Sequence, residues 1–441
     1  MANRSRVNVI TTVLMLSLAI SASAEEVRNG PLNLSQSIAI ALENNRQIHA
    51  ARQEALAARA KVKETRTSFF PQLTGQTSYT KLKEVPSISF EMPPFGPQTM
   101  EMGKDEIYDQ KATLTQPLYA GGAIYYTYKG ARSELAAAQS RYDRIRQKLI
   151  YDVKESYFNL LRVQKLTLVC VQAVKQIQAH LKVVQDYYDV GIVPRNDLLT
   201  AQVRLANAKQ DLIEAENKVK LARSIFNNLL GWDIEREIQI VLVESFKPLV
   251  LNLDDCTREA YEERPELKEA EANIAAGMSN IRVAKSGYKP TLSISGEYES
   301  EKGTASSPDD FDESWAAMAI ATLNIWDWGA TGKRVLQAEA GLESLKDSLI
   351  LLRGAVALEI KEAYLSLNEA QKKLDVMAKS IEQAQENLRI MEEKYKAQAA
   401  TTTEVLDAQT LLTGAQTSYF QALYDCHIAK ARIDMAMGRG G

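Results

Sequence analysis

Two acidic residues in the second half of the chain are the strongest candidates for a chemical role. Glu404 and Asp407 lie three positions apart, so a helix would place both carboxylates on one face. Such a pair can attract cations, or it can stabilise the positive end of the helix dipole. Asp197 follows Asn196 at a comparable place in the first half, where a dipole role fits equally well. The residues alone leave both interpretations open.

The other reactive residue types form no catalytic or metal-binding pattern. Three histidines are present, His49, His180 and His427. Each falls in a separate predicted helix without a recurring acid or nucleophile, and the chain has no P-loop or glycine-rich dinucleotide motif. Three cysteines are present, Cys170, Cys256 and Cys426. Their wide spacing fits neither a zinc pattern nor a disulfide framework, so we interpret them as buried or inert thiols.

Three methionines share the segment 84–106, namely Met92, Met100 and Met102. They could bind a soft metal, but no histidine or cysteine lies near them. We therefore expect no enzyme activity, no cofactor and no metal site.

The first residues, 1–24, have the pattern of a secretory signal peptide. Arg4 and Arg6 precede an apolar run, and Ala22-Ser23-Ala24 supplies a small-x-small cleavage site. Removing the two arginines takes the formal charge from −3 to −5, which argues against nucleic acid as a partner. No run of 18 apolar residues follows, so a membrane role would have to come from strands.

The remainder of the chain is a tandem duplication. Between Leu198 and Leu229 apolar residues and alanines follow an unbroken 3-4 heptad spacing, and adding 207 to each number gives a second seam from Val405 to Ala436. Nearer the amino terminus the displacement is 219. We divide the chain into a first repeat, 25–231, a linker, 232–254, and a second repeat, 255–441.

Each repeat is predicted to run helix, strand, strand, long helix, turn, helix. Alternating residues place strands at about 72–82, 108–118, 291–300 and 314–326. The first helix is predicted from an N-cap at Ser35 to Ser68, whereas Pro265 should break its counterpart. The proline-containing segment 84–106 is predicted to be an irregular exposed loop, and the linker to have some strand character.

The predicted strands have one apolar face and one acidic or hydroxylic face. They could form a soluble, half-buried sheet or the wall of a membrane barrel. Four strands cannot close a barrel, and open edges are excluded from lipid because their backbone groups would lack partners. In the membrane interpretation several copies must therefore share one barrel, and three copies would give 12 strands.

Three further motifs complete the pattern: Phe70-Pro71 before a strand, Gln116-Pro117-Leu118-Tyr119-Ala120-Gly121-Gly122 after one, and Thr403-Glu404-Val405-Leu406-Asp407-Ala408-Gln409 in the last helix. With the signal peptide and the duplicated plan, they resemble the TolC-type outer membrane efflux proteins over essentially the whole mature chain. The resemblance implies a mainly α fold with a membrane β-barrel: a homotrimer whose 12-stranded barrel joins a long periplasmic α-helical barrel.

The resemblance also implies a function. Such proteins are outer membrane channels, the exit ducts of tripartite efflux or type I secretion systems. Their partners are a periplasmic adaptor, an inner-membrane pump and outer membrane lipid. A periplasmic coiled-coil scaffold is the alternative; it would explain the heptads but would not require strands with an apolar face. No motif selects the exported substrate.

By the same resemblance, Glu404 and Asp407 match acidic rings at the periplasmic entrance, and Asp197 and Tyr395 match positions that hold the closed tips together. Ala400 replaces an arginine of that pattern, which leaves the gate looser or dependent on other residues such as Arg195.

Two turns are expected to contact the adaptor. The first contains Val190, Gly191, Ile192 and Val193, and the second contains Gln398 and Ala399. The second turn departs from the family pattern because Gln398 stands where glycine is expected.

Overall fold

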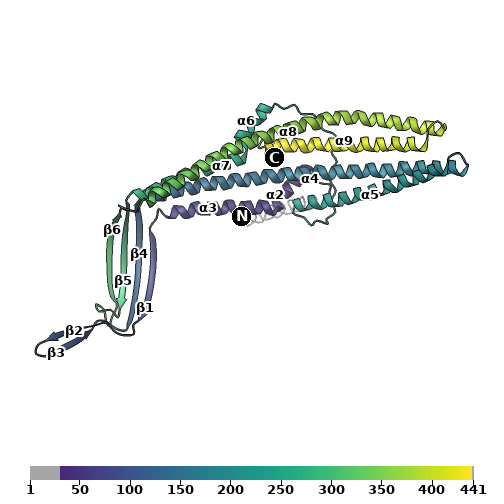
Figure 1. Ribbon diagram of the computed structural model, residues 1–441. Coiled ribbons are helices and arrows are strands. Elements are labelled where there is room, and N and C mark those ends of the chain that lie inside the picture. Colours follow the sequence, from purple (N-terminus) through teal and green to yellow (C-terminus); the bar gives the residue numbers. More distant parts are fainter. Residues whose placement is uncertain (1–29, 440–441) are drawn as a thin grey trace, which may run out of the picture. The chain divides into compact units, whose positions relative to one another are not determined.

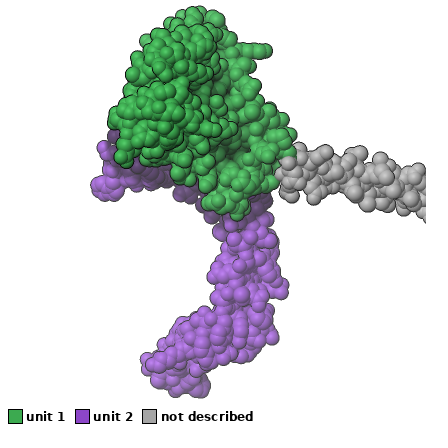
Figure 2. Space-filling view, turned by 90° about the vertical axis from the view of Figure 1, so that its right-hand side faces the viewer, with its two compact units in different colours: residues 1–52, 141–267, 352–441 green, residues 53–140, 268–351 purple. Residues whose placement is uncertain are grey.

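The computed structural model describes residues 30–439, so the predicted signal peptide lies outside the described residues. The chain forms two compact units, coloured separately in Figure 2. Unit 1 contains the described residues up to 52, then 141–267 and the residues from 352 onward; unit 2 contains 53–140 and 268–351. Within residues 30–439, none of the helices combines the length and the apolar composition needed to cross a membrane.

The described residues are mainly helical, and the order of elements occurs twice (Figure 1). The first repeat contains α2 (Leu34–Asn44), α3 (Arg46–Thr67), β1 (Gln72–Lys81), β2 (Ser87–Met92), β3 (Gly96–Glu101), β4 (Glu106–Ala120), α4 (Ala123–Asp189) and α5 (Arg195–Leu229). The second contains α6 (Leu253–Glu263), α7 (Pro265–Lys285), the short 3-10 helix η1 (Ser286–Tyr288), β5 (Thr291–Lys302), β6 (Asp312–Thr322), α8 (Ala330–Lys396) and α9 (Thr402–Ala436). The long helices α4 and α8 have 67 residues each.

The prediction of one continuous first helix from Ser35 is wrong. The N-cap is Asn33, whose side chain accepts a hydrogen bond from the backbone of Gln36, while the Gln36 side chain accepts one from the backbone of Asn33. The helix then breaks at Asn45, which is extended. Arg264 is the extended residue at the equivalent break between α6 and α7, where Pro265 begins the new helix as predicted.

The four long strands form one antiparallel sheet in the order β1-β4-β5-β6. The central pair, β4 and β5, joins the two repeats, and β1 and β6 form the edges. Residues of β4 alternate between more exposed and less exposed side chains along most of the strand. Strand β6 ends at Thr322, before the expected end at 326.

The expectation of an irregular loop at 84–106 is also wrong, because this segment contains the hairpin β2–β3. The linker has less strand character than expected: within the described residues it contributes a single parallel bridge, between Ile240 and Leu32.

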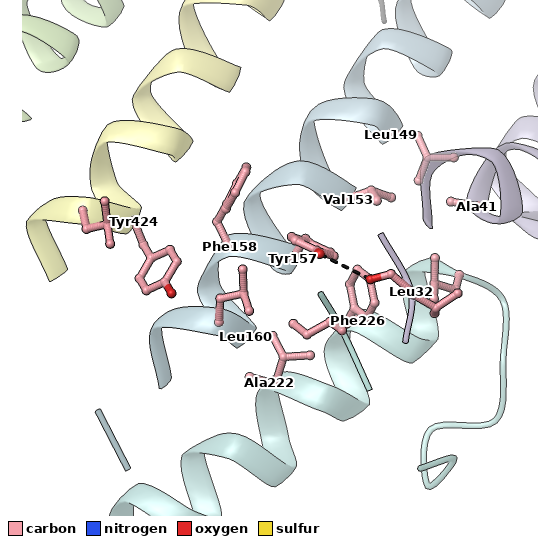
Figure 3. Packing of buried hydrophobic residues seen from close by; sticks show 14 of the residues in the cluster. Leu32, Ala41, Leu149, Val153, Tyr157, Phe158, Leu160, Ala222, Phe226 and Tyr424 are labelled. Carbon is pink, nitrogen blue, oxygen red and sulfur yellow. Dashed lines mark hydrogen bonds between the residues drawn. The ribbon is translucent and has the colours of Figure 1, made fainter. Parts of the chain in front are cut away.

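The core of unit 1 gathers α2, α4, α5, α9 and the linker around Tyr157 (Figure 3). The Tyr157 hydroxyl donates to the carbonyl oxygens of Val241, at 2.7 Å, and Leu32, at 3.3 Å. Its ring packs edge-on against Phe226 of α5. One side chain of α4 thus ties the linker and the amino-terminal segment to the helices.

The heptad seams are buried as predicted, although unequally. In α5 the buried positions are mainly alanines seven residues apart, from Ala201 to Ala222. In α9 nearly every seam position is buried, and further residues such as Leu406 and Tyr424 are buried beside the seam. Helix α5 therefore leaves more of its surface uncovered within one chain than α9 does.

Candidate functional site

The predicted site residues lie at the tips of two helical hairpins in unit 1. One tip joins α4 to α5 through residues 190–194, and the other joins α8 to α9 through residues 397–401. Both tips are far from the sheet in sequence and lie at the free ends of the hairpins in Figure 1.

The first turn ends α4 with a glycine in the left-handed conformation. The amide of Ile192 donates to the carbonyl of Tyr187 at 2.8 Å, and the amide of Gly191 donates to the carbonyl of Tyr188 at 2.9 Å. This is the Schellman arrangement, in which the left-handed residue is usually glycine. Gly191 has φ +78°, and Val190 and Ile192 are exposed.

The second turn has the same hydrogen bonds without the glycine. The amide of Ala399 donates to the carbonyl of Lys394 at 2.8 Å, and that of Gln398 donates to Tyr395 at 3.0 Å. Gln398 therefore adopts φ +59°, a conformation that is costly for a residue with a Cβ. Glutamine in place of the expected glycine at position 398 therefore adds strain to this turn without changing its backbone geometry.

Tyr395 lies in a buried cluster behind the second turn. Its side chain is 4% exposed, its ring stacks on Tyr187 at 5.7 Å between centroids, and its hydroxyl shares a hydrogen bond of 3.2 Å with the Thr402 hydroxyl. The pKa of Tyr395 is raised, mainly because the side chain is buried. The hydrogen bond with Thr402 lowers the pKa in part, and the negative charge of Asp197 raises it further. The structure thus places Asp197 near enough to act on Tyr395 electrostatically, while the hydroxyl bonds Thr402.

His180 of α4 packs edge-on against the same tyrosine ring, at 4.9 Å between centroids. It is 8% exposed, and its Nε2 has no hydrogen-bond partner among the described residues. Burial lowers the pKa of His180 to about 4, so the ring is neutral at physiological pH.

Glu404 closes a capping box at the start of α9. Its carboxylate accepts from the Thr401 amide at 2.7 Å and from the Thr401 hydroxyl at 2.9 Å, and the Glu404 amide donates to that hydroxyl at 3.3 Å. These hydrogen bonds lower the pKa of Glu404. The side chain remains solvent-exposed, so its charge is available at the tip as well as stabilising the helix.

Asp407 connects the two hairpins. Its Oδ1 lies 3.4 Å from a guanidinium nitrogen of Arg204 on α5, and both side chains are partly solvated. The sequence does not predict the role of Arg204, because nothing in the local pattern relates residues 203 positions apart. Thr401 was not among the predicted site residues, although the Thr-x-x-Glu spacing signals a capping box. The structure pairs Arg204 of α5 with Asp407 of α9 and places Asp197 of α5 near Tyr395 of α8, whereas the two turns lie at separate tips.

A groove of about 330 Å³ borders Arg204 of the ion pair. It is lined by Arg204 and Asp211 of α5, Gln409 and Thr413 of α9, and Cys170 of α4, among others. Within residues 30–439 no group of three or more histidine, cysteine, aspartate or glutamate side chains is arranged to hold a metal ion.

The profile of the family described as outer membrane efflux protein matches residues 38–231 and 257–439. The chain belongs to this family. The predicted resemblance is therefore confirmed, and with it the assignment to the bacterial outer membrane. Nothing in the comparisons supports the scaffold alternative.

Individual members of the outer membrane efflux protein family are distant in sequence. Outer membrane protein TolC of Escherichia coli is 24% identical over 312 residues, which cover 67% of this chain and 62% of that protein. The chain thus spans less than two thirds of the length of this relative.

The fold is similar over a larger share of the chain. The outer-membrane channel OprN superposes with a TM-score of 0.78 at 20% identity, covering 92% of this chain and 90% of that one. The Campylobacter jejuni CmeC outer membrane channel superposes with a TM-score of 0.80 at 18% identity, covering 92% and 86%.

Proposed function

We propose that three copies of this protein form an outer membrane channel, the exit duct of a tripartite efflux pump or of a type I secretion system. The observation that carries the proposal is the four-stranded sheet, which has two open edges and one exposed apolar face.

The two faces of the sheet have different chemistry. Leu73 of β1, Leu114 of β4 and Ile294 of β5 alternate with polar residues and are exposed, at 71%, 47% and 45%. The other face carries the ion pair between Lys111 of β4 and Glu297 of β5. A wall with lipid on one side and water on the other needs this alternation.

The open edges require further copies. A lipid-exposed edge would leave its amide and carbonyl groups unpaired, at several kcal/mol for each group. Pairing β6 of one copy with β1 of the next removes both edges, and three copies close 12 strands. Exposed aromatic residues lie toward both ends of the sheet, as in the aromatic belts of such barrels. They are Tyr79 and Tyr108 toward one end, and Trp326 and Trp328 just beyond β6 toward the other.

The helices also leave apolar positions uncovered in one chain. Leu351, Leu358 and Leu365 of α8 are exposed and lie seven residues apart, and α5 exposes Val203 and Ile213. A heptad seam without a partner favours packing against another helix. Neighbouring copies would supply that partner and build a periplasmic tunnel from the hairpins.

At the tips we assign a gate. Asp407 is held by Arg204 across the hairpins, and Tyr395 is held by its hydrogen bond to Thr402 within the electrostatic influence of Asp197. In a trimer Glu404 and Asp407 would each become three carboxylates around one axis, which attract cations. Arg204 supplies a cation between hairpins where Ala400 removes the one expected from the family pattern.

We assign adaptor binding to the two turns. Val190, Gly191, Ile192 and Val193 form an apolar, glycine-containing turn, and Gln398 and Ala399 repeat its backbone geometry. An inner-membrane pump would complete the assembly through the adaptor.

The first test is the mass of the mature protein in mild detergent together with carbonate extraction of membranes. A trimer that stays in the outer membrane fraction and conducts ions in planar bilayers supports the proposal. A monomer or dimer released by carbonate without detergent would refute the shared barrel.

A further inference from the structure

The hairpin β2–β3 has an apolar face that no other described part of the chain covers. Its register pairs Ile88 with Met100, Phe90 with Gln98 and Met92 with Gly96, so the even-numbered side chains share one face. Ile88 is 53% exposed, Met92 45% and Met100 61%. Phe95 in the turn is exposed as well.

The opposite face is polar and acidic. Ser89 faces Thr99 with 3.0 Å between their hydroxyl oxygens, Ser87 faces Glu101, and Glu91 faces Pro97. The hairpin is therefore amphipathic, with its carboxylates on one side and its methionine, isoleucine and phenylalanine side chains on the other.

The base of the hairpin is held in place by the loop between β5 and β6. The amide of Lys104 donates to the carbonyl of Gly303 at 2.8 Å, and the Lys104 ammonium pairs with Asp309. A Cβ at Gly103 would come within 2.6 Å of the Gly303 carbonyl, so the two loops are in close contact. The hairpin leaves the sheet from a fixed base rather than from a free loop.

The size of the apolar face bears on what covers it. Two strands of six residues span roughly 10 by 20 Å, whereas each partner of a stable protein interface buries about 800 Å². The face is too small to hold a protein partner by itself. Lipid has no such threshold, because interfacial binding grows with whatever apolar area is buried.

The position of the hairpin favours lipid for a second reason. It is inserted between β1 and β4, whose last outward-facing aromatic residues before it are the paired rings Tyr79 and Tyr108, 5.0 Å apart. The ion pair of Lys81 with Glu106 lies on the same face between these rings and the hairpin. Tyrosine at the end of an apolar strand face is typical of a membrane–water interface. The hairpin therefore begins just beyond the tyrosine rings, on the water side of this interface and within reach of it.

We propose that β2–β3 is a membrane anchor: its apolar face inserts among lipid acyl chains at the rim of the barrel while Glu91 and Glu101 stay in water. The inference rests on the proposed function, which puts the outward face of the sheet in lipid. It assigns the hairpin a lipid-binding role beyond that of a loop at the channel mouth.

The test uses an environment-sensitive fluorophore on single cysteines in the full-length trimer, with Cys170, Cys256 and Cys426 replaced by alanine. Met100→Cys places the probe on the apolar face, and Thr99→Cys places it on the opposite face of the same strand. Leu114→Cys labels the outward face of the sheet. Each labelled trimer is reconstituted in phosphatidylcholine vesicles with and without nitroxide-labelled phosphatidylcholine.

We expect a blue shift and a loss of fluorescence to nitroxide lipid at positions 100 and 114 but not at 99. Quenching at 114 without quenching at 100 would overturn the anchor and leave the proposed function intact. No quenching at 114 would count against the membrane-facing sheet itself. Efficient disulfide formation between Met100→Cys copies within one trimer would instead assign the face to contacts between copies.

Discussion

The strained second turn gives a quantitative prediction about Gln398. A left-handed conformation costs a residue with a Cβ roughly 1–2 kcal/mol, and glycine avoids this cost. The greater conformational freedom of glycine in the unfolded state offsets about 0.5–1 kcal/mol of this stabilisation. Gln398→Gly should therefore stabilise the closed turn by about 1 kcal/mol.

Hydrogen exchange of the trimer in detergent measures this change locally. The amides of Gln398 and Ala399 are held by the two turn hydrogen bonds, to Tyr395 and Lys394. If these amides exchange through local opening of the turn, raising the free energy of opening by about 1 kcal/mol slows their exchange about fivefold.

The first turn provides the matched control. Gly191 has φ +78°, and a Cβ added there meets nothing within 4 Å, so Gly191→Ala changes only the backbone preference. The substitution should lower the free energy of opening of this turn by about 1 kcal/mol, so that the Ile192 amide exchanges about fivefold faster. Unchanged or faster exchange of Ala399 in Gln398→Gly would show that the strain argument is wrong.

Three further predictions concern the same tips. Arg204→Ala removes an exposed ion pair worth up to about 1 kcal/mol per copy and should raise the open probability of the channel in planar bilayers. Lys209→Ala removes a positive charge from α5 outside that pair and should leave the open probability unchanged. Equal effects of the two variants would refute a role of the Arg204–Asp407 pair in the gate. Glu404→Gln keeps a capping residue and should reduce cation selectivity while lowering thermal stability less than Thr401→Ala, which should cost about 1 kcal/mol of stability and leave selectivity unchanged. Because burial lowers the pKa of His180 to about 4, protonation opposes folding, and stability should be lost as pH falls from the ordinary value of 6.5 toward 4; a His180→Leu variant that loses the same stability over this range would contradict the assignment.

Local patterns predicted the regular elements well where one periodicity dominates. The heptads in α5 and α9 and the alternation in β1, β4 and β5 extend over many residues, so no single contact decides them. The break at Asn45 was missed because no proline marks it, whereas Pro265 marks the equivalent break.

The hairpin β2–β3 was missed for a related reason. Prolines were interpreted as evidence against strands, yet Pro93 and Pro94 lie in the turn and Pro86 precedes β2. Pro97 lies within β3, where a two-stranded ribbon has an open edge and a missing amide costs little.

The site could be predicted only in part. Asp197, Tyr395, Glu404 and Asp407 were predicted through the family resemblance, and the structure gives local partners to the side chains of Tyr395, Glu404 and Asp407. The contact of Arg204 with Asp407 depends on how two distant hairpins pack, which no sequence periodicity encodes.

The central position of the β4–β5 pair has a consequence for biogenesis. β1 and β4 can pair early, but β5 follows only after the whole segment 123–288 has been made. Until then the inner edge of β4 carries unpaired backbone groups and can pair with the wrong strand. A chain arrested before β5 would therefore be prone to aggregate, because the pairing of β5 with β4 is the step that joins the two repeats into one sheet.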